Sequence, residues 1–125
     1  MTMEFFFPED NLDRVSPEET EITSLTAEPY PDGRRLHVNI EMSAFLQRPH
    51  IDILITNGNG EEVASANVVE PMTFKIEFTM HLRGELKNPH TLEAKLFYPD
   101  GPSKEPKTFS FDVTPPPPEP EADSA

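Results

Sequence analysis

The sequence predicts an all-β domain, a seven-stranded antiparallel β-sandwich between two ends of different composition. Three observations predict it. Apolar residues alternate with polar residues over several segments, which is the period of a strand with one buried face. Turn-forming residues separate these segments at intervals of roughly eight to twelve residues. No segment of helical period lies between them, so an antiparallel sandwich is favoured over a parallel sheet with crossover helices.

The first expected strand covers Thr20 to Ala27, a threonine-rich segment that contains Ile22 and Leu25. The residues before it, Ser16-Pro17-Glu18-Glu19, have the form of a helix start, with a serine cap, a proline in first position and a glutamate three residues on. Because threonine and isoleucine favour strands over helices, we expect at most one turn of helix before the strand begins.

Five further strands show a clear alternation, and we expect their apolar members to face the core. These members are Leu36, Val38, Ile40 and Met42; Ile51, Ile53 and Ile55; Phe74, Ile76, Phe78, Met80 and Leu82; Leu92, Ala94 and Leu96; and Phe109, Phe111 and Val113. The segment from Val63 to Val69 is a weaker strand, and the sequence leaves its inward set ambiguous.

Turn chemistry separates the strands. Pro-Asp-Gly occurs twice, after Tyr30 and after Tyr98, and it supplies a preset φ, a local side-chain bond and a residue that tolerates positive φ. Asn57-Gly58 is a strong hairpin signal. These turns predict short connections between neighbouring antiparallel strands.

Charge divides the chain into an irregular acidic lead-in (1–19), a sandwich domain (20–113) and a disordered proline-rich tail (114–125). The net charge is −13 over the whole chain, but residues 22–113 carry only −4. The acidity therefore belongs largely to the ends. It argues against nucleic acid and anionic membranes as partners, because both need a basic surface.

The chain contains no cysteine, which excludes disulfides, zinc-thiolate sites and thiol catalysis. A reducing compartment suits this composition, and we expect a cytoplasmic protein. The start has only three apolar aromatics before Pro8, which is too short for a signal peptide. No stretch approaches the roughly 20 apolar residues of a spanning helix.

The tail contains the run Pro115-Pro116-Pro117-Pro118. Proline cannot donate to a strand ladder, so we expect polyproline II or disorder there. Two interpretations stay open: a ligand for a proline-reading groove, or a solubilising tail or linker.

The strand count and spacing resemble immunoglobulin-like and fibronectin type III-like modules over roughly Thr20 to Val113. The chain departs from those families in having no tryptophan and no cysteine. Such modules often carry a tyrosine near the start of the sixth strand, and the corresponding residue is His90. The resemblance implies the sandwich fold and little about activity.

No residue pattern predicts catalysis. The four histidines, which share no short metal-ligand spacing, are His37, His50, His81 and His90. His37 and His81 fall on outward positions of neighbouring strands near Glu41 and Glu77, so a surface zinc site is one interpretation and exposed, unpaired histidines the favoured one. No serine lies in a nucleophile elbow, and no glycine-rich segment matches a phosphate loop. We expect no enzyme, no cofactor and no metal.

Two apolar side chains break the outward pattern, Leu54 and Phe97. If the third, sixth and seventh strands share a sheet, these two are expected to be cross-strand neighbours on its outer face, close to Lys95 and Ser110. A pair of this kind indicates cover or a partner. Cover by Phe5, Phe6 and Phe7 of the same chain and a contact with another protein or a second copy are both open, and so is the possibility that the two side chains never meet.

The leading hypothesis is therefore a non-catalytic protein-interaction module that uses the Leu54/Phe97 face or a strand edge, with an unknown protein partner or a second copy. The alternative is a carbohydrate- or small-ligand-binding accessory domain. Such a domain needs exposed aromatics on loops, and only Tyr30 and Tyr98 fit that description.

Overall fold

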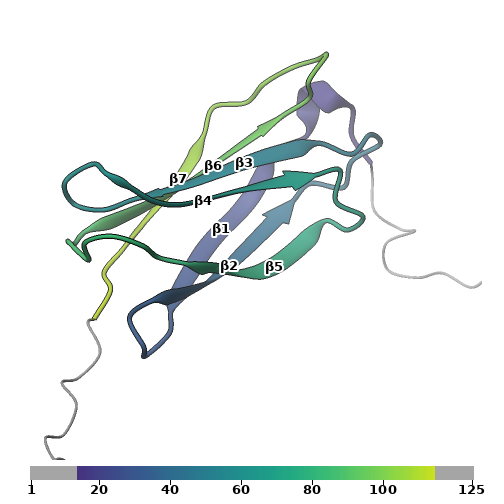
Figure 1. Ribbon diagram of the computed structural model, residues 1–125. Coiled ribbons are helices and arrows are strands. Elements are labelled where there is room, and N and C mark those ends of the chain that lie inside the picture. The colour runs from purple at the N-terminus through teal and green to yellow at the C-terminus, as the bar shows by residue number, and fades with distance from the viewer. Residues whose placement is uncertain (1–13, 115–125) are drawn as a thin grey trace, which may run out of the picture.

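The computed structural model describes residues 14–114, and it confirms the predicted all-β sandwich. Seven strands form two antiparallel sheets that pack face to face (Figure 1). The strands are β1 (Ile22–Pro29), β2 (Arg35–Met42), β3 (His50–Thr56), β4 (Glu62–Val69), β5 (Lys75–His81), β6 (His90–Phe97) and β7 (Lys107–Phe111).

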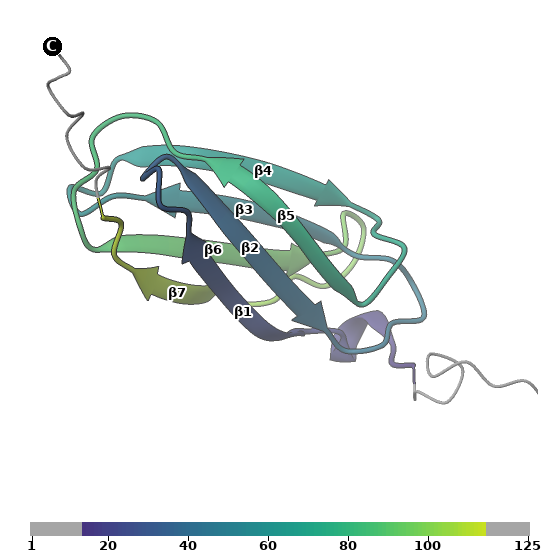
Figure 2. The same ribbon diagram turned by 90° about the horizontal axis from the view of Figure 1, so that it is seen from below.

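One sheet has the order β1-β2-β5 and the other the order β4-β3-β6-β7. The third, sixth and seventh strands share a sheet, as expected. In constant-type immunoglobulin domains the fourth strand joins the sheet of the first, second and fifth. Here β4 pairs with β3 instead. As a result β4 and β5 are the edges of different sheets on one side of the sandwich, and β1 and β7 are the edges on the other (Figure 2).

The core lies between β2 and the central strands β3 and β6 of the other sheet. Their alternation is confirmed, because every predicted inward residue of these three strands is buried. Strand β1 shows no clean alternation in the sequence for a structural reason. A register shift between Ile22 and Ser24 lets Ile22 and Ala27 both face the core, although their spacing is odd.

A 3-10 helix, Pro17–Glu19, precedes β1, which confirms the expected single turn. Its predicted serine cap is wrong, since the Ser16 hydroxyl makes no capping bond. The Thr20 hydroxyl instead donates to the Ser16 carbonyl at 2.8 Å, and Thr20 is fully buried. The side-chain hydrogen bond at this turn therefore comes from Thr20, the residue after the helix, and not from Ser16.

Both Pro-Asp-Gly segments are tight turns, with Gly33 N donating to Tyr30 O at 3.1 Å and Gly101 N donating to Tyr98 O at 2.9 Å. Gly33 has the predicted positive φ, +69°. Gly101 does not, so that part of the prediction is wrong for the second turn. Each turn still reverses the chain as expected.

One predicted core segment is only half-buried. Phe74, Ile76 and Phe78 face inward, yet each keeps part of its surface exposed. The cause is that β5 is an edge strand and β4, opposite it, is an edge as well, so no further strand of residues 14–114 covers these side chains. The prediction of their direction is correct, and the prediction of full burial is wrong.

Candidate interaction surface at the open side of the sandwich

The side of the sandwich between β4 and β5 exposes part of the inner face. We call this surface the β4/β5 groove and define it by five half-buried apolar residues, Ala66, Val68, Phe74, Ile76 and Phe78. Among the described residues, strand β5 pairs only with β2, and β4 pairs only with β3. Both rims of the groove therefore carry strand edges with unpaired main-chain groups, which are the usual template for adding another strand.

The two rims meet at one end of the groove. There Arg83 N donates to Val63 O at 2.9 Å. Between this bond and the connection at residues 70–74, no hydrogen bond between described residues joins β4 to the β5 rim. The groove is thus separated along most of its length.

A hollow of about 390 Å³ lies in this separated part. Its β4 wall consists of the small residues Ala64, Ser65 and Ala66, which leave space opposite Phe78. Two basic residues, His81 and Arg83, line the same hollow. The groove thus combines an apolar floor with basic groups at one end.

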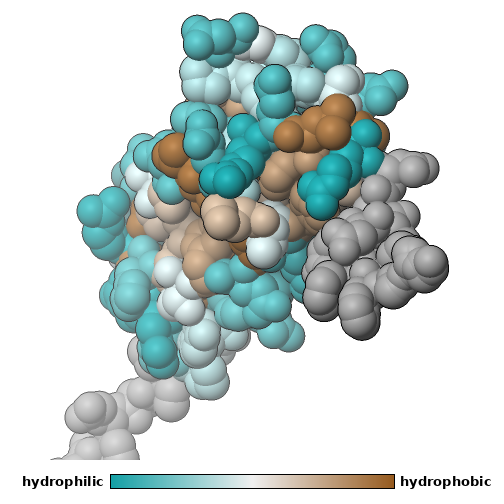
Figure 3. All heavy atoms as spheres, turned by 90° about the vertical axis from the view of Figure 1, so that its right-hand side faces the viewer, coloured by the Kyte–Doolittle hydropathy of each residue, from teal (hydrophilic) through white to brown (hydrophobic). Residues whose placement is uncertain are grey.

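The other end of the groove is apolar and strongly exposed. The exposed large hydrophobic residues in the described part of the chain are Leu46 (65%), Val69 (63%) and Met72 (77%). They belong to the β2–β3 connection, the last residue of β4 and the β4–β5 connection. Figure 3 shows this end of the molecule, where apolar side chains gather at the centre among hydrophilic ones. A group of exposed large apolar side chains of this kind is typical of an interaction site.

Arg14 fastens the start of the described chain to this end. Its guanidinium lies 5.1 Å from the ring centroid of Phe74, and its Nη1 donates to Phe45 O at 3.4 Å. Val15 continues the attachment, donating to Ala44 O at 2.7 Å and accepting from Leu46 N at 3.0 Å. Residues 1–13 therefore join the described chain beside the groove.

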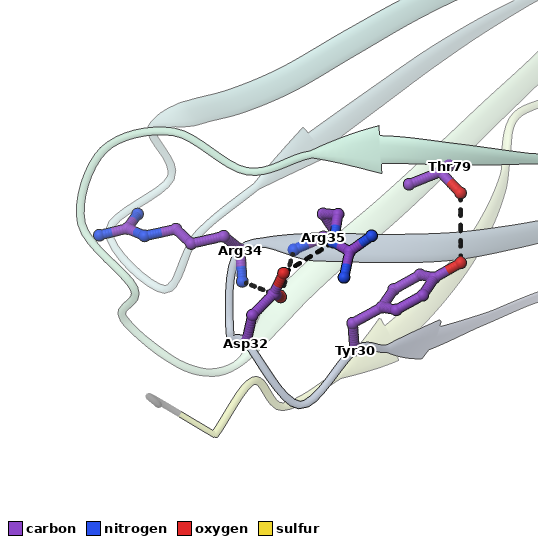
Figure 4. A network of polar contacts seen from close by, with 5 residues as sticks. All are labelled: Tyr30, Asp32, Arg34, Arg35 and Thr79. Carbon is purple, nitrogen blue, oxygen red and sulfur yellow. Dashed lines mark hydrogen bonds and ion pairs between the residues drawn. The ribbon is translucent and has the colours of Figure 1, made fainter. Parts of the chain in front are cut away.

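A polar network fixes the β1–β2 turn (Figure 4). The Asp32 carboxylate accepts hydrogen bonds from the backbone N–H of Arg34 at 2.9 Å and of Arg35 at 3.1 Å, and from Arg35 Nε at 2.7 Å. These bonds favour the charged carboxylate and lower the pKa of Asp32 to about 2. The bond from the Arg34 N–H makes the largest contribution. The turn beside β5 is therefore rigidly built.

The two tyrosines expected at a carbohydrate site are both engaged. Arg35 lies 4.5 Å from the ring centroid of Tyr30, and the Tyr30 and Thr79 hydroxyls are 3.3 Å apart (Figure 4). Tyr98 is only 8% exposed and donates to Gln47 O at 2.8 Å. Its burial raises the pKa of the Tyr98 hydroxyl. Tyr98 presents no open face for a sugar ring, and one face of Tyr30 is covered.

A shallow depression of about 670 Å³ lies beside Tyr98. Its charged or titratable lining residues are Glu18, Arg48, His50, Glu70 and Asp100. Within residues 14–114, no three histidine, cysteine, aspartate or glutamate side chains converge as a metal site would require. The depression offers a mixed polar and apolar surface and, within the described residues, no metal-binding set.

The expected contact between Leu54 and Phe97 is wrong. Both lie on the outer face of the four-stranded sheet, but Leu54 is opposite Glu93 while Phe97 is opposite His50. This register separates them by four residues, about 13 Å along the strands. Asp52 and Lys95, which lie opposite each other on β3 and β6, separate the two apolar side chains.

Ser110 of β7 was also expected near this pair. It lies opposite Thr91 of β6 and not beside Phe97. Phe5, Phe6 and Phe7, the proposed cover, lie outside the described residues, as does the proline run of the tail. The predicted face is therefore not one contiguous surface.

The histidines make no cluster. His37 Nε2 lies 3.2 Å from Glu77 Oε1, so this histidine is paired and not isolated as expected. His81 lies opposite Arg35 and lines the β4/β5 groove. His37 is therefore neither part of a zinc site within the described residues nor an unpaired surface histidine.

His90, at the expected corner position, is fully buried at the start of β6. Its Nδ1 lies 2.9 Å from Asn88 Oδ1, and its ring stacks on Phe111 with the centroids 5.4 Å apart. Its Nε2 is buried without a hydrogen-bond partner in the structure. Burial lowers the pKa of His90, although Asp112 opposes the shift. The ring is a structural part of the core in its neutral form.

Sequence reasoning missed the β4/β5 groove. It assigned Phe74, Ile76 and Phe78 to the core because their alternation is clear. The available signal was in the opposite strand, where Ala64 and Ala66 are small and the inward set was ambiguous. Small residues facing large ones at two sheet edges indicate a gap that a third element could fill.

Comparison with known proteins supports the fold. No protein-family model matches the sequence, and no curated protein matches it. The structure is similar to part of a glycosyl hydrolase family 2 member from Bacteroides cellulosilyticus DSM 14838, with a TM-score of 0.53 and 14% sequence identity. The similarity covers 74% of this chain and 15% of that chain. At this identity the likeness shows a shared β-sandwich and not a shared activity.

The described residues contain no helix with the length and apolar character needed to cross a membrane.

Proposed function

We propose that this domain is a non-catalytic protein-interaction module that binds an extended peptide segment in the β4/β5 groove. One observation carries the proposal: two strand edges that are unpaired within the described residues flank partly exposed inner-face side chains such as Val68 and Ile76. An extended segment satisfies both features at once. Its main chain pairs with a strand edge, and alternate side chains enter the apolar floor.

The groove also defines the chemistry of the segment. Its floor selects apolar side chains, and the hollow opposite Phe78 has room for a large one. His81 and Arg83 favour an acidic group at that end. At the opposite end Met72 and Val69 offer further apolar contact. The proposed ligand is therefore an extended, apolar segment with acidic flanks. The cysteine-free composition suits a reducing compartment, and we place the protein in the cytoplasm.

A carbohydrate-binding accessory domain is the second candidate, favoured by the fold that the chain shares with part of a glycosyl hydrolase family 2 member. The engaged rings of Tyr30 and Tyr98 oppose it. A glycan array separates the two candidates, because the proposed module gives no signal on it.

The test is a titration of the ¹⁵N-labelled full chain with a short synthetic peptide of alternating valine and glutamate. We expect the amide signals of β4 and β5 to shift, and a peptide with serine in place of valine to have no effect. The double variant Val68→Thr/Ile76→Thr keeps β-branched side chains and is expected to weaken binding by roughly tenfold or more.

Leu54→Thr is the matched control, because it makes the same kind of change on the outer face of the sheet. It is expected to bind the peptide as the wild type does. Shifts confined to the outer face or to the depression beside Tyr98, or no shifts at all, contradict the proposal.

A further inference from the structure

We infer that the chain carries its own ligand for the β4/β5 groove: the N-terminal segment Phe5-Phe6-Phe7 docks there and competes with outside segments. The inference rests on the proposed function, because it assumes that the groove accepts an extended apolar segment. It names the first occupant and adds a regulatory consequence.

The segment has the chemistry that the groove selects. It reads Glu4-Phe5-Phe6-Phe7-Pro8-Glu9-Asp10, three consecutive aromatics with acidic residues on both sides. In an extended chain Phe5 and Phe7 point to the same face, and Phe6 points to the other. Two rings can therefore enter the groove together.

The chain starts from the right place. Arg14 is the first described residue, and its guanidinium lies against Phe74, a residue of the groove. Val15 holds the following residues to the β2–β3 connection through two main-chain hydrogen bonds. Residues 1–13 are thus tethered at the apolar end of the groove, next to the exposed Leu46.

The tether is long enough. Phe7 precedes Arg14 by seven residues, which span up to about 23 Å when extended. From Phe74, just before β5, to Phe78 the groove spans four residues, about 13 Å. The aromatic segment therefore reaches the five residues that define the groove without being fully stretched.

The charges agree with this placement. Glu4 precedes the aromatics, on the side away from the tether at Arg14, so a segment that runs from the tether along the groove carries it toward the hollow. His81 and Arg83 line that hollow, and neither forms an ion pair within the described residues. Glu4 and the basic end of the groove therefore attract one another, an interaction that salt weakens.

Tethering makes even a weak contact effective. A short linker gives the segment an effective concentration of about 1 mM. If the free segment had a dissociation constant of about 0.1 mM, it would fill the groove about ten times more often than not, and an outside peptide would bind about tenfold more weakly. Only a partner whose affinity for the groove is high enough to displace the segment would then bind.

The experiment uses the full chain with Phe5→Ser, Phe6→Ser and Phe7→Ser combined. We expect the amide signals of residues 64–68 and 74–78 to shift on this substitution, and the valine–glutamate peptide to bind about tenfold more tightly. The matched control replaces the same three residues by leucine, which keeps the segment apolar and is expected to preserve the wild-type affinity. Light scattering is expected to give a monomer for all three proteins.

Unchanged amide signals in both groups of residues overturn the inference, whatever the peptide does. Shifted signals without peptide binding keep the intramolecular contact and overturn the proposed function. Peptide binding at the groove with equal affinity in wild type and serine variant keeps the proposed function and overturns the inference. A wild-type dimer that the serine variant lacks also overturns it, because the occupant is then a second copy.

Discussion

The two long sides of the sandwich are built differently. On the β1/β7 side the connection after β6 stays on the sheet, with Lys104 N donating to Leu96 O at 2.9 Å. The Lys104 ammonium also donates to the carbonyl of Glu18 in the 3-10 helix before β1, and β1 and β7 pack more closely against each other than β4 and β5 do. On the β4/β5 side no hydrogen bond between described residues crosses from rim to rim until Arg83. The chain's own connection thus closes one side, and the other is the side at which we propose that a ligand binds.

The largest expected effect separates the enclosed core from the open side. Leu96→Ala empties a site that is 1% exposed, and we expect it to lower the free energy of unfolding by about 3 kcal/mol. Ile76→Ala is expected to cost about 1.5 kcal/mol, because its side chain is already partly exposed. Chemical denaturation measures both in the Phe5→Ser/Phe6→Ser/Phe7→Ser background, where the aromatic segment no longer fills the groove. Equal losses in that background would show that Ile76 is enclosed as fully as Leu96.

The second prediction concerns pH. His90 stacks on Phe111 of β7, and burial lowers its pKa in the folded state below its ordinary value of about 6.5. The unfolded chain therefore binds the proton first, so the stability present above pH 6.5 is lost as the pH falls through the folded-state pKa. Denaturation midpoints measured between pH 7.5 and 5 report this loss.

We expect His90→Gln to flatten this pH dependence, because the neutral amide takes up no proton. A profile as steep as that of the wild type would contradict the assignment to His90.

A smaller effect is expected where the closed side is fastened. Lys104→Met keeps the apolar stem and removes the bond to the Glu18 carbonyl. We expect a loss of about 0.5 to 1 kcal/mol and faster amide hydrogen exchange in β1 and β7. Exchange that rises in β4 and β5 instead would contradict the assignment of the closing contact.

The smallest effect is expected on the outer face of the four-stranded sheet. Leu54→Ser is predicted to leave the oligomeric state unchanged and to cost less than about 1 kcal/mol, because Leu54 is only half-buried and does not meet Phe97. Light scattering and denaturation test both statements. A change in self-association would restore this face as an interaction surface.

Local pattern was enough to predict the strands. The period-two alternation from Leu36 to Met42 determines which side chains face inward, since a one-residue slip would expose all of them. It could not reveal the switch of β4 to the other sheet, which depends on long-range pairing. That switch places two edges opposite one another and leaves Ile76 half-exposed.

The sequence also could not predict the register, that is, which residues of neighbouring strands lie opposite each other. Leu54 and Phe97 were correctly assigned to one outer face, but the distance between them depends on how β3 and β6 align. The groove combines both effects, because it needs the sheet assignment of β4 and the alignment of Ala66 with the β5 side chains. Neither is encoded within a single strand.

The most direct test of the open side is a search for NOEs from aromatic ring protons to the methyl groups of Val68 and Ile76 in the methyl-labelled full chain. We predict NOEs from the rings of Phe5 or Phe7, and their replacement by peptide contacts when a tighter extended peptide is added. If these methyls contact neither the chain's own segment nor any added peptide, the β4/β5 groove is not a binding site.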